Sequence, residues 1–127
     1  MVGVTYDTGA LVAAERGQRR MWSRHRALLV NGDVPTVAAP VVAQAWRGGG
    51  GQALLARLLR GCDIESLSDV LARSVGTLAA KAGTTDIIDA AVAEGALRRR
   101  DLVISSDSRD LQAIAGSVHL HLEVEPP

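Results

Sequence analysis

Residues 102–105 read Leu-Val-Ile-Ser, a continuous aliphatic run that Asp107 follows two positions later. A strand buried on both faces of a parallel sheet has this unbroken hydrophobic character, whereas a strand with one wet face alternates apolar and polar residues. The run therefore predicts an inner strand of a parallel sheet, with Asp107 just past its carboxyl end.

Outward from this run, the chain alternates short β-prone stretches with helical ones. Further strands are predicted over residues 2–6, 34–39, 62–67 and 118–124, and helices over 8–16, 19–30, 40–46, 52–60, 68–82, 84–97 and 111–115. This alternation predicts an α/β fold, in which a mostly parallel sheet of about five strands lies between helices on both faces. With 127 residues and neither an internal repeat nor a linker, the chain is expected to form a single domain, residues 1–127.

Composition narrows the classes of protein. Only three aromatic residues occur (Tyr6, Trp22, Trp46), which argues against a nucleic-acid reader that stacks bases on an aromatic platform. The single cysteine, Cys62, excludes an intrachain disulfide and is expected in the core, and no Cys/His set has zinc spacing. Asp7 interrupts the apolar N-terminus, and no run approaches the ~18 apolar residues of a membrane span. We therefore expect a cytoplasmic protein without membrane contact.

The basic residues concentrate in the first half of the chain. Residues 1–61 carry eight arginines against three acids, and residues 62–127 carry six basic residues against eleven acids. Four arginines, Arg19, Arg20, Arg24 and Arg26, lie in the helix predicted over 19–30, and Arg47 follows a later helix. They are candidates for contacts with RNA phosphates, although a solvated helix face explains the same pattern.

Four aspartates are expected at one edge of the sheet, because ligands of open parallel sheets bind beyond the carboxyl ends of the strands. Asp7 ends the first predicted strand, and Asp107 follows the run over 102–105. Asp86 and Asp89 are three residues apart at a helix start, so they share one face of that helix. Each acid alone has an ordinary alternative role as a helix cap.

Four unpaired carboxylates in one cleft repel one another unless divalent cations bind between them. Ligation by carboxylates alone favours hard ions such as Mg²⁺ or Mn²⁺ over zinc, and such ions can stabilise the reacting oxygens of a phosphodiester. The pattern thus predicts metal-dependent phosphoryl chemistry, with Asp7, Asp86, Asp89 and Asp107 as metal ligands.

Four segments together resemble the PIN domains of VapC-type toxin ribonucleases. These segments, which span nearly the whole chain, are Tyr6-Asp7-Thr8-Gly9-Ala10-Leu11, Pro40-Val41-Val42-Ala43-Gln44, Asp86-Ile87-Ile88-Asp89-Ala90-Ala91-Val92-Ala93 and Val103-Ile104-Ser105-Ser106-Asp107-Ser108-Arg109-Asp110-Leu111. The resemblance implies a PIN-like three-layer sandwich, Mg²⁺ or Mn²⁺ at the acidic residues, cleavage of structured RNA such as tRNA or rRNA, a homodimer and inhibition by a cognate antitoxin. It assigns catalytic roles to Asp7, Asp89 and Asp107 and an auxiliary role to Asp86.

One position departs from the family pattern. The helix after the second strand normally supplies a glutamate in these nucleases, and here Gln44 occupies that position. Glutamine offers an oxygen without a charge, so reduced metal affinity or activity is expected. The alternative function is a catalytically weak or inactive PIN module that binds RNA or an antitoxin.

Other classes fit the sequence less well. A response-regulator receiver needs a lysine after its last strand, but Lys81 is the only lysine, and a haloacid-dehalogenase phosphatase needs an Asp-x-Asp pair where this chain has Asp7-Thr8-Gly9. His119 and His121 are expected on one face of the last strand, as an exposed edge and not as metal ligands. The glycines at 48–51 lack a phosphate-binding motif.

Overall fold

The computed structural model describes residues 2–127 and contains five strands and seven α-helices. The strands are β1 (Val4–Tyr6), β2 (Thr36–Ala38), β3 (Asp63–Glu65), β4 (Leu102–Ile104) and β5 (Val124–Glu125). The helices are α1 (Thr8–Glu15), α2 (Arg19–Val30), α3 (Ala39–Ala45), α4 (Ala53–Arg60), α5 (Asp69–Ala82), α6 (Ile87–Arg99) and α7 (Ser108–Gly116), with a 3-10 turn over Gly50–Gln52 before α4.

The sheet is parallel throughout and has the strand order β3-β2-β1-β4-β5. From β1 the chain builds outward through β2 to β3, and then crosses to the other side of β1 to add β4 and β5. The strand order therefore reverses between β1 and β4, and a ligand site is expected beyond their carboxyl ends.

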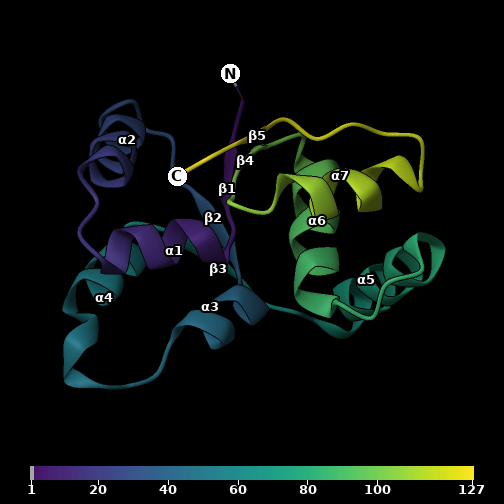
Figure 1. Ribbon diagram of the computed structural model, residues 1–127, viewed down its shortest axis with the longest axis horizontal. Coiled ribbons are helices and arrows are strands. Elements are labelled where there is room, and N and C mark those ends of the chain that lie inside the picture. The colour runs from purple at the N-terminus through teal and green to yellow at the C-terminus, as the bar shows by residue number, and fades with distance from the viewer. Residues whose placement is uncertain (1) are drawn as a thin grey trace.

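Helices cover both faces of the sheet, as predicted. Figure 1 shows the strands nearly edge-on, with α1 to α4 on one side and α5 to α7 on the other. The core between these layers is aliphatic and includes Leu11, Val37, Leu58 and Val103, all fully buried. The fully buried Tyr6 is its one aromatic residue, and its hydroxyl lies 2.9 Å from Nδ1 of His25.

Local signals in the sequence fix the start of three of the seven helices and the end of one of them. Asp7, Ser68 and Asp86 lie at the N-caps of α1, α5 and α6, where their side chains accept backbone hydrogen bonds. Helix α5 ends at Gly83, whose φ of 68° is the left-handed conformation that glycine adopts without strain. None of the helices in residues 2–127 has the length and apolar character that crossing a bilayer demands.

The strand predicted over residues 118–124 is wrong for most of its length. The chain turns after α7, where His119 has a φ of 60°, and only Val124 and Glu125 pair with β4. The side-chain amide of Gln112 forms hydrogen bonds with both backbone polar groups of Leu122. The Leu122 amide donates to Oε1 of Gln112, and the Leu122 carbonyl accepts from Nε2 of Gln112. His119 and His121 therefore do not share a strand face.

The third predicted strand exists but is shorter, over Asp63–Glu65 at an edge of the sheet. Ile64 remains exposed there, and Cys62 is half-buried just before the strand, with its thiol donating to the carbonyl of Leu58. Burial raises the pKa of this thiol to about 12, so Cys62 is an unreactive packing residue.

Candidate metal centre

Asp7 is held firmly where β1 passes into α1. Its side chain is only 4% exposed, and its Oδ1 accepts a 2.7 Å hydrogen bond from the backbone amide of Thr8. The hydroxyl of Ser105, which directly follows β4, donates to Oδ2 at 2.7 Å. Both carboxylate oxygens are therefore oriented by donors from adjacent strand ends.

Asp86 and Asp89 open helix α6 from the opposite face of the sheet. Oδ1 of Asp86 accepts a 2.9 Å hydrogen bond from the amide of Asp89, while Asp86 itself is exposed to solvent. Asp89 is 8% exposed. Its burial, together with the charges of Asp86, Asp107 and Asp7, raises the pKa of Asp89 to about 7.

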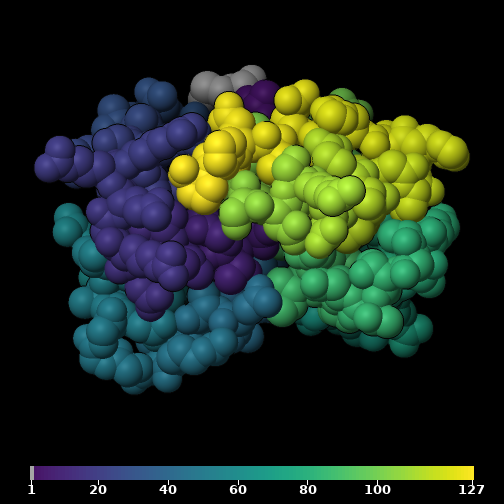
Figure 2. Space-filling model, in the orientation of Figure 1, coloured from purple at the N-terminus to yellow at the C-terminus, as the bar shows by residue number. Residues whose placement is uncertain are grey.

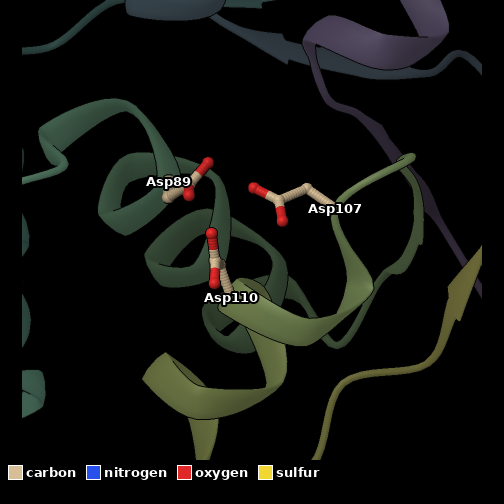
Figure 3. A group of neighbouring side chains, drawn as sticks. All are labelled: Asp89, Asp107 and Asp110. Atoms are coloured by element: carbon tan, nitrogen blue, oxygen red, sulfur yellow. The ribbon is translucent and has the colours of Figure 1, made fainter.

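Asp107 lies at the start of α7, but its side chain makes no capping hydrogen bond. Its backbone amide donates to the hydroxyl of Ser105 at 2.9 Å, and its carboxylate points toward Asp89 and Asp110 (Figure 3). Burial and the nearby charge of Asp110 raise the pKa of Asp107. One carboxylate oxygen each from Asp89, Asp107 and Asp110 lies within 4.8 Å of the others, and Figure 3 shows these side chains converging from α6 and α7.

A cavity of about 570 Å³ joins all four predicted acids. Its lining includes Asp7, Asp86, Asp89 and Asp107, together with Gln44. The cavity lies beyond the carboxyl ends of β1 and β4, where the strand order reverses. Asp110 faces a smaller neighbouring cavity that also reaches Asp86 and Asp89.

Glycine at position 9 permits the close approach of the two sides of this site. A Cβ atom at Gly9 would lie 3.0 Å from the backbone nitrogen of Ser106 and closer still to its hydroxyl. Any larger side chain would therefore push the β4–α7 loop, which carries Asp107, away from α1.

The donor set suits a hard divalent cation. Three helices, α1, α6 and α7, begin at the site, and the partial positive charge of their N-termini offsets part of the repulsion among the carboxylates. The pKa values of Asp89 and Asp107 are nevertheless raised, so the helix N-termini do not fully compensate for the burial and mutual repulsion of these carboxylates when no cation is bound. Oxygen donors in this number are typical ligands of Mg²⁺ or Mn²⁺.

Gln44 lines the cavity from α3, opposite the start of α1. Its Oε1 accepts a hydrogen bond from the hydroxyl of Thr8, the residue after Asp7. The glutamine is thus within reach of the acidic site, and its amide oxygen is already committed to Thr8.

The arginines proposed as RNA contacts lie outside this cavity. Arg19 and Arg20 are exposed on α2, and Arg19 lines a separate cavity of about 440 Å³ that also contains two further arginines of α2 and α4. Arg24 lies 3.5 Å from Glu125, and the guanidinium of Arg47 donates to backbone carbonyls at the end of α3. The guanidinium groups of Arg24 and Arg47 therefore already have partners within the protein.

Two features of the site escaped the sequence reasoning. Asp110 repeats, after Asp107, the three-residue spacing of Asp86 and Asp89, and this repetition is a signal that was available in the sequence. Arg16 also lines the large cavity, at the far end of α1 from Asp7. Nothing in its local sequence separates Arg16 from the arginines of α2.

Comparison with known proteins supports the fold. Neither a protein-family model nor a curated protein matches the sequence. Among solved structures, VapBC2 from Rickettsia felis bound to a DNA fragment from its promoter matches with a TM-score of 0.70 at 14% identity, over 100% of this chain and 99% of that one. PAE2754 from Pyrobaculum aerophilum matches with a TM-score of 0.66 at 16% identity, over 97% of this chain and 83% of that one. The chain has the fold of a VapC-type PIN domain, as the resemblance in its sequence implies.

Proposed function

We propose that the protein is a metal-dependent endoribonuclease toxin that cleaves structured RNA, such as tRNA or rRNA, and is neutralised by a cognate antitoxin. The observation that carries this proposal is the convergence of Asp7, Asp86, Asp89 and Asp107 on one cavity at the switch point of the sheet. The fold shared with VapBC2 supports the toxin–antitoxin context.

The chain's own residues have separate roles in this proposal. Asp7, Asp89 and Asp107 would hold Mg²⁺ or Mn²⁺, with Asp86 as an auxiliary ligand. Asp110 joins these candidate ligands because one of its carboxylate oxygens lies close to those of Asp89 and Asp107. The bound ion supplies electrostatic stabilisation of the negative charge that develops on the phosphodiester. Ser105 and the amide of Thr8 orient Asp7, and the amide of Asp89 orients Asp86.

The carboxylates also restrict what enters the cavity. Without a cation, their negative charge repels a phosphodiester, so RNA binding at this end of the cavity depends on the ion. Burial of Asp7 and Asp89 excludes bulk water from the ligand oxygens, which strengthens their interaction with any cation.

The alternative is a weakly active or inactive module that binds RNA or an antitoxin. The observation in its favour is Gln44, whose amide oxygen is engaged by Thr8 and carries no charge. Cleavage of RNA by the purified protein separates the two functions, because a binding module leaves the strand intact.

The partner proposals, an antitoxin and a second copy of the chain, are supported by apolar side chains that the described chain leaves open. Val30 is exposed at the end of α2 and Val34 just after it, and Ile64, Leu67 and Val70 are exposed around β3 and the start of α5. Light scattering of the purified protein alone tests the second copy, and co-expression with a candidate antitoxin tests the other partner. A monomer that co-purifies with no such partner would contradict them.

The test of the enzyme uses a labelled RNA hairpin with single-stranded flanks. We expect cleavage in Mg²⁺ or Mn²⁺, none in EDTA, and none from Asp7→Asn or Asp89→Asn. Asp63→Asn is the matched control, because Asp63 is an exposed aspartate at the opposite end of the strands. Equal cleavage with and without chelator, or by wild type and Asp89→Asn, would contradict the proposal. Mapping RNA 5′ ends after expression in a bacterial host would then identify the substrate.

A further inference from the structure

The large cavity extends well beyond the acidic residues. Thr8, Val12 and Arg16 all line it, and their spacing of four places them on one face of α1. From Asp7 at the N-cap to Arg16 at the C-cap, the helix rise of 1.5 Å per residue gives a length of about 13 Å. The cavity is thus a groove along α1 with aspartates at one end and an arginine at the other.

Arg16 is the only lysine or arginine among the residues that line this groove. It is exposed, and within residues 2–127 its side chain forms no ion pair. Arg24, Arg98 and Arg99 by contrast all lie against acidic side chains. The guanidinium of Arg16 is therefore free to bind an anion from solution.

The far end of the groove is also walled by the segment that follows β5. Pro127 lines the cavity together with Arg16 and Gln18. In Figure 2 the yellow C-terminal residues lie between the blue-purple segment of α1 and α2 and the yellow-green segment at the start of α7. Pro127 thus borders the groove beside Arg16.

We propose that Arg16 binds a backbone phosphate of an RNA strand lying in the groove, further along the strand than the phosphate at the aspartates; this inference rests on the proposed function. The 13 Å between the two ends, about nine residues of helix, exceeds the spacing of neighbouring phosphates along a strand. A guanidinium matches phosphate geometry through paired N–H donors. Arg16 would position the strand without contacting the reacting atoms.

A purely structural role predicts a different result. A cation at the C-cap of α1 also complements the negative end of the helix dipole. If this were the only role of Arg16, its replacement would lower the melting temperature and leave RNA binding by the folded protein unchanged.

The test measures binding of a fluorescein-labelled single-stranded RNA by fluorescence anisotropy across several salt concentrations, in EDTA and in Mg²⁺, with the Mg²⁺ readings taken on mixing, before the strand is cleaved. We expect Arg16→Gln to weaken binding by about three- to tenfold and to reduce the slope of log K against log salt by about 0.7, the value for one phosphate contact on a single strand. Arg16→Lys should retain most of the binding, because the charge remains. Arg60→Gln is the control with the same loss of charge, since Arg60 is exposed at the end of α4, just before β3.

Equal binding and salt slope for wild type and Arg16→Gln, or equal losses for Arg16→Gln and Arg60→Gln, would overturn the role of Arg16. If the wild type still cleaves RNA in that case, the proposed function stands without this contact. Absence of RNA binding by the wild type in both EDTA and Mg²⁺ would overturn the inference and the proposed function together. If Arg16→Gln fails to fold, Arg16→Met, which also removes the charge but keeps an aliphatic stem, takes its place in the same measurements and should show the same loss.

Discussion

The hydroxyl of Ser105 joins two strand ends by donating a 2.7 Å hydrogen bond to Oδ2 of Asp7, a residue 98 positions earlier in the chain. The same hydroxyl accepts from the backbone amide of Asp107 at 2.9 Å. One buried serine thus fixes the relative positions of two predicted metal ligands that follow the neighbouring parallel strands β1 and β4.

Ser105→Ala should therefore weaken both the fold and the metal site. Its loss leaves a buried carboxylate oxygen of Asp7 without a donor, which we expect to cost about 2 kcal/mol of unfolding free energy. Urea denaturation measures this cost, and calorimetry with Mn²⁺ should show weaker binding. Ser66→Ala, in an exposed loop, is the control and should match wild type in both measurements. Unchanged stability and Mn²⁺ affinity in Ser105→Ala would show that this link is unimportant.

Asp89→Asn should stabilise the metal-free protein, and increasingly so as the pH rises. The pKa of Asp89 in the folded protein is about 7, against an ordinary value of 3.8. The loss of folding stability caused by its negative charge is therefore absent below pH 4 and complete above pH 7. In EDTA we expect similar melting temperatures for variant and wild type near pH 4, and a gain of about 5 °C for the variant at pH 8.

The comparison at each pH removes the effect of His25, whose pKa is lowered by burial and whose titration acts on both proteins alike. A melting temperature of Asp89→Asn that falls below wild type at pH 8 would identify Asp89 as a structural residue and count against the site.

Gly9→Ala tests the close packing between α1 and the β4–α7 loop. The added methyl group would lie 3.0 Å from the nitrogen of Ser106, so we expect a loss of about 1–3 kcal/mol in urea denaturation, together with weaker Mn²⁺ binding. Gly76→Ala in α5 is the matched control, because the space around Gly76 is open. This control should gain up to about 1 kcal/mol from helix propensity. Equal gains in both variants would mean that the loop moves freely away.

Gln44→Glu should tighten metal binding. The side chains are nearly isosteric, and the glutamate keeps the acceptor for Thr8 while adding a negative charge to the wall of the cavity. We expect a lower Mn²⁺ concentration at half-saturation in calorimetry, and faster RNA cleavage if Gln44 limits activity. Gln18→Glu adds the same charge to the other end of the groove and should change Mn²⁺ affinity much less. Unchanged affinity in Gln44→Glu would show that this side chain does not face the ion.

Elements with a strong local signal were predictable from sequence. The run at residues 102–105 packs as an inner strand, and Asp7, Ser68 and Asp86 cap helices as their residue types favour. The strand predicted from Val118 to Val124 is wrong for most of its length, because an alternating pattern alone does not provide a neighbouring strand to pair with. There, the turn at His119 and the side chain of Gln112 take the chain out of the sheet.

The candidate site was predictable in part, for a related reason. The position of an acid after a strand or at a helix start follows from local sequence, so Asp7, Asp86, Asp89 and Asp107 could be named before their convergence was seen. Arg16 could not be singled out, because its place in the groove depends on the packing of α1 near residues far away in the sequence, such as Pro127. That contact between distant segments leaves no periodic trace in the sequence.

The most direct test of the metal site is anomalous X-ray scattering from a crystal soaked in Mn²⁺. We expect an anomalous peak within bonding distance of carboxylate oxygens of Asp89 and Asp107, with Asp7 or Asp110 adjacent, and no such peak in crystals of Asp89→Asn. An absence of manganese at these aspartates in the wild type, or a peak held by other residues, would contradict this expectation.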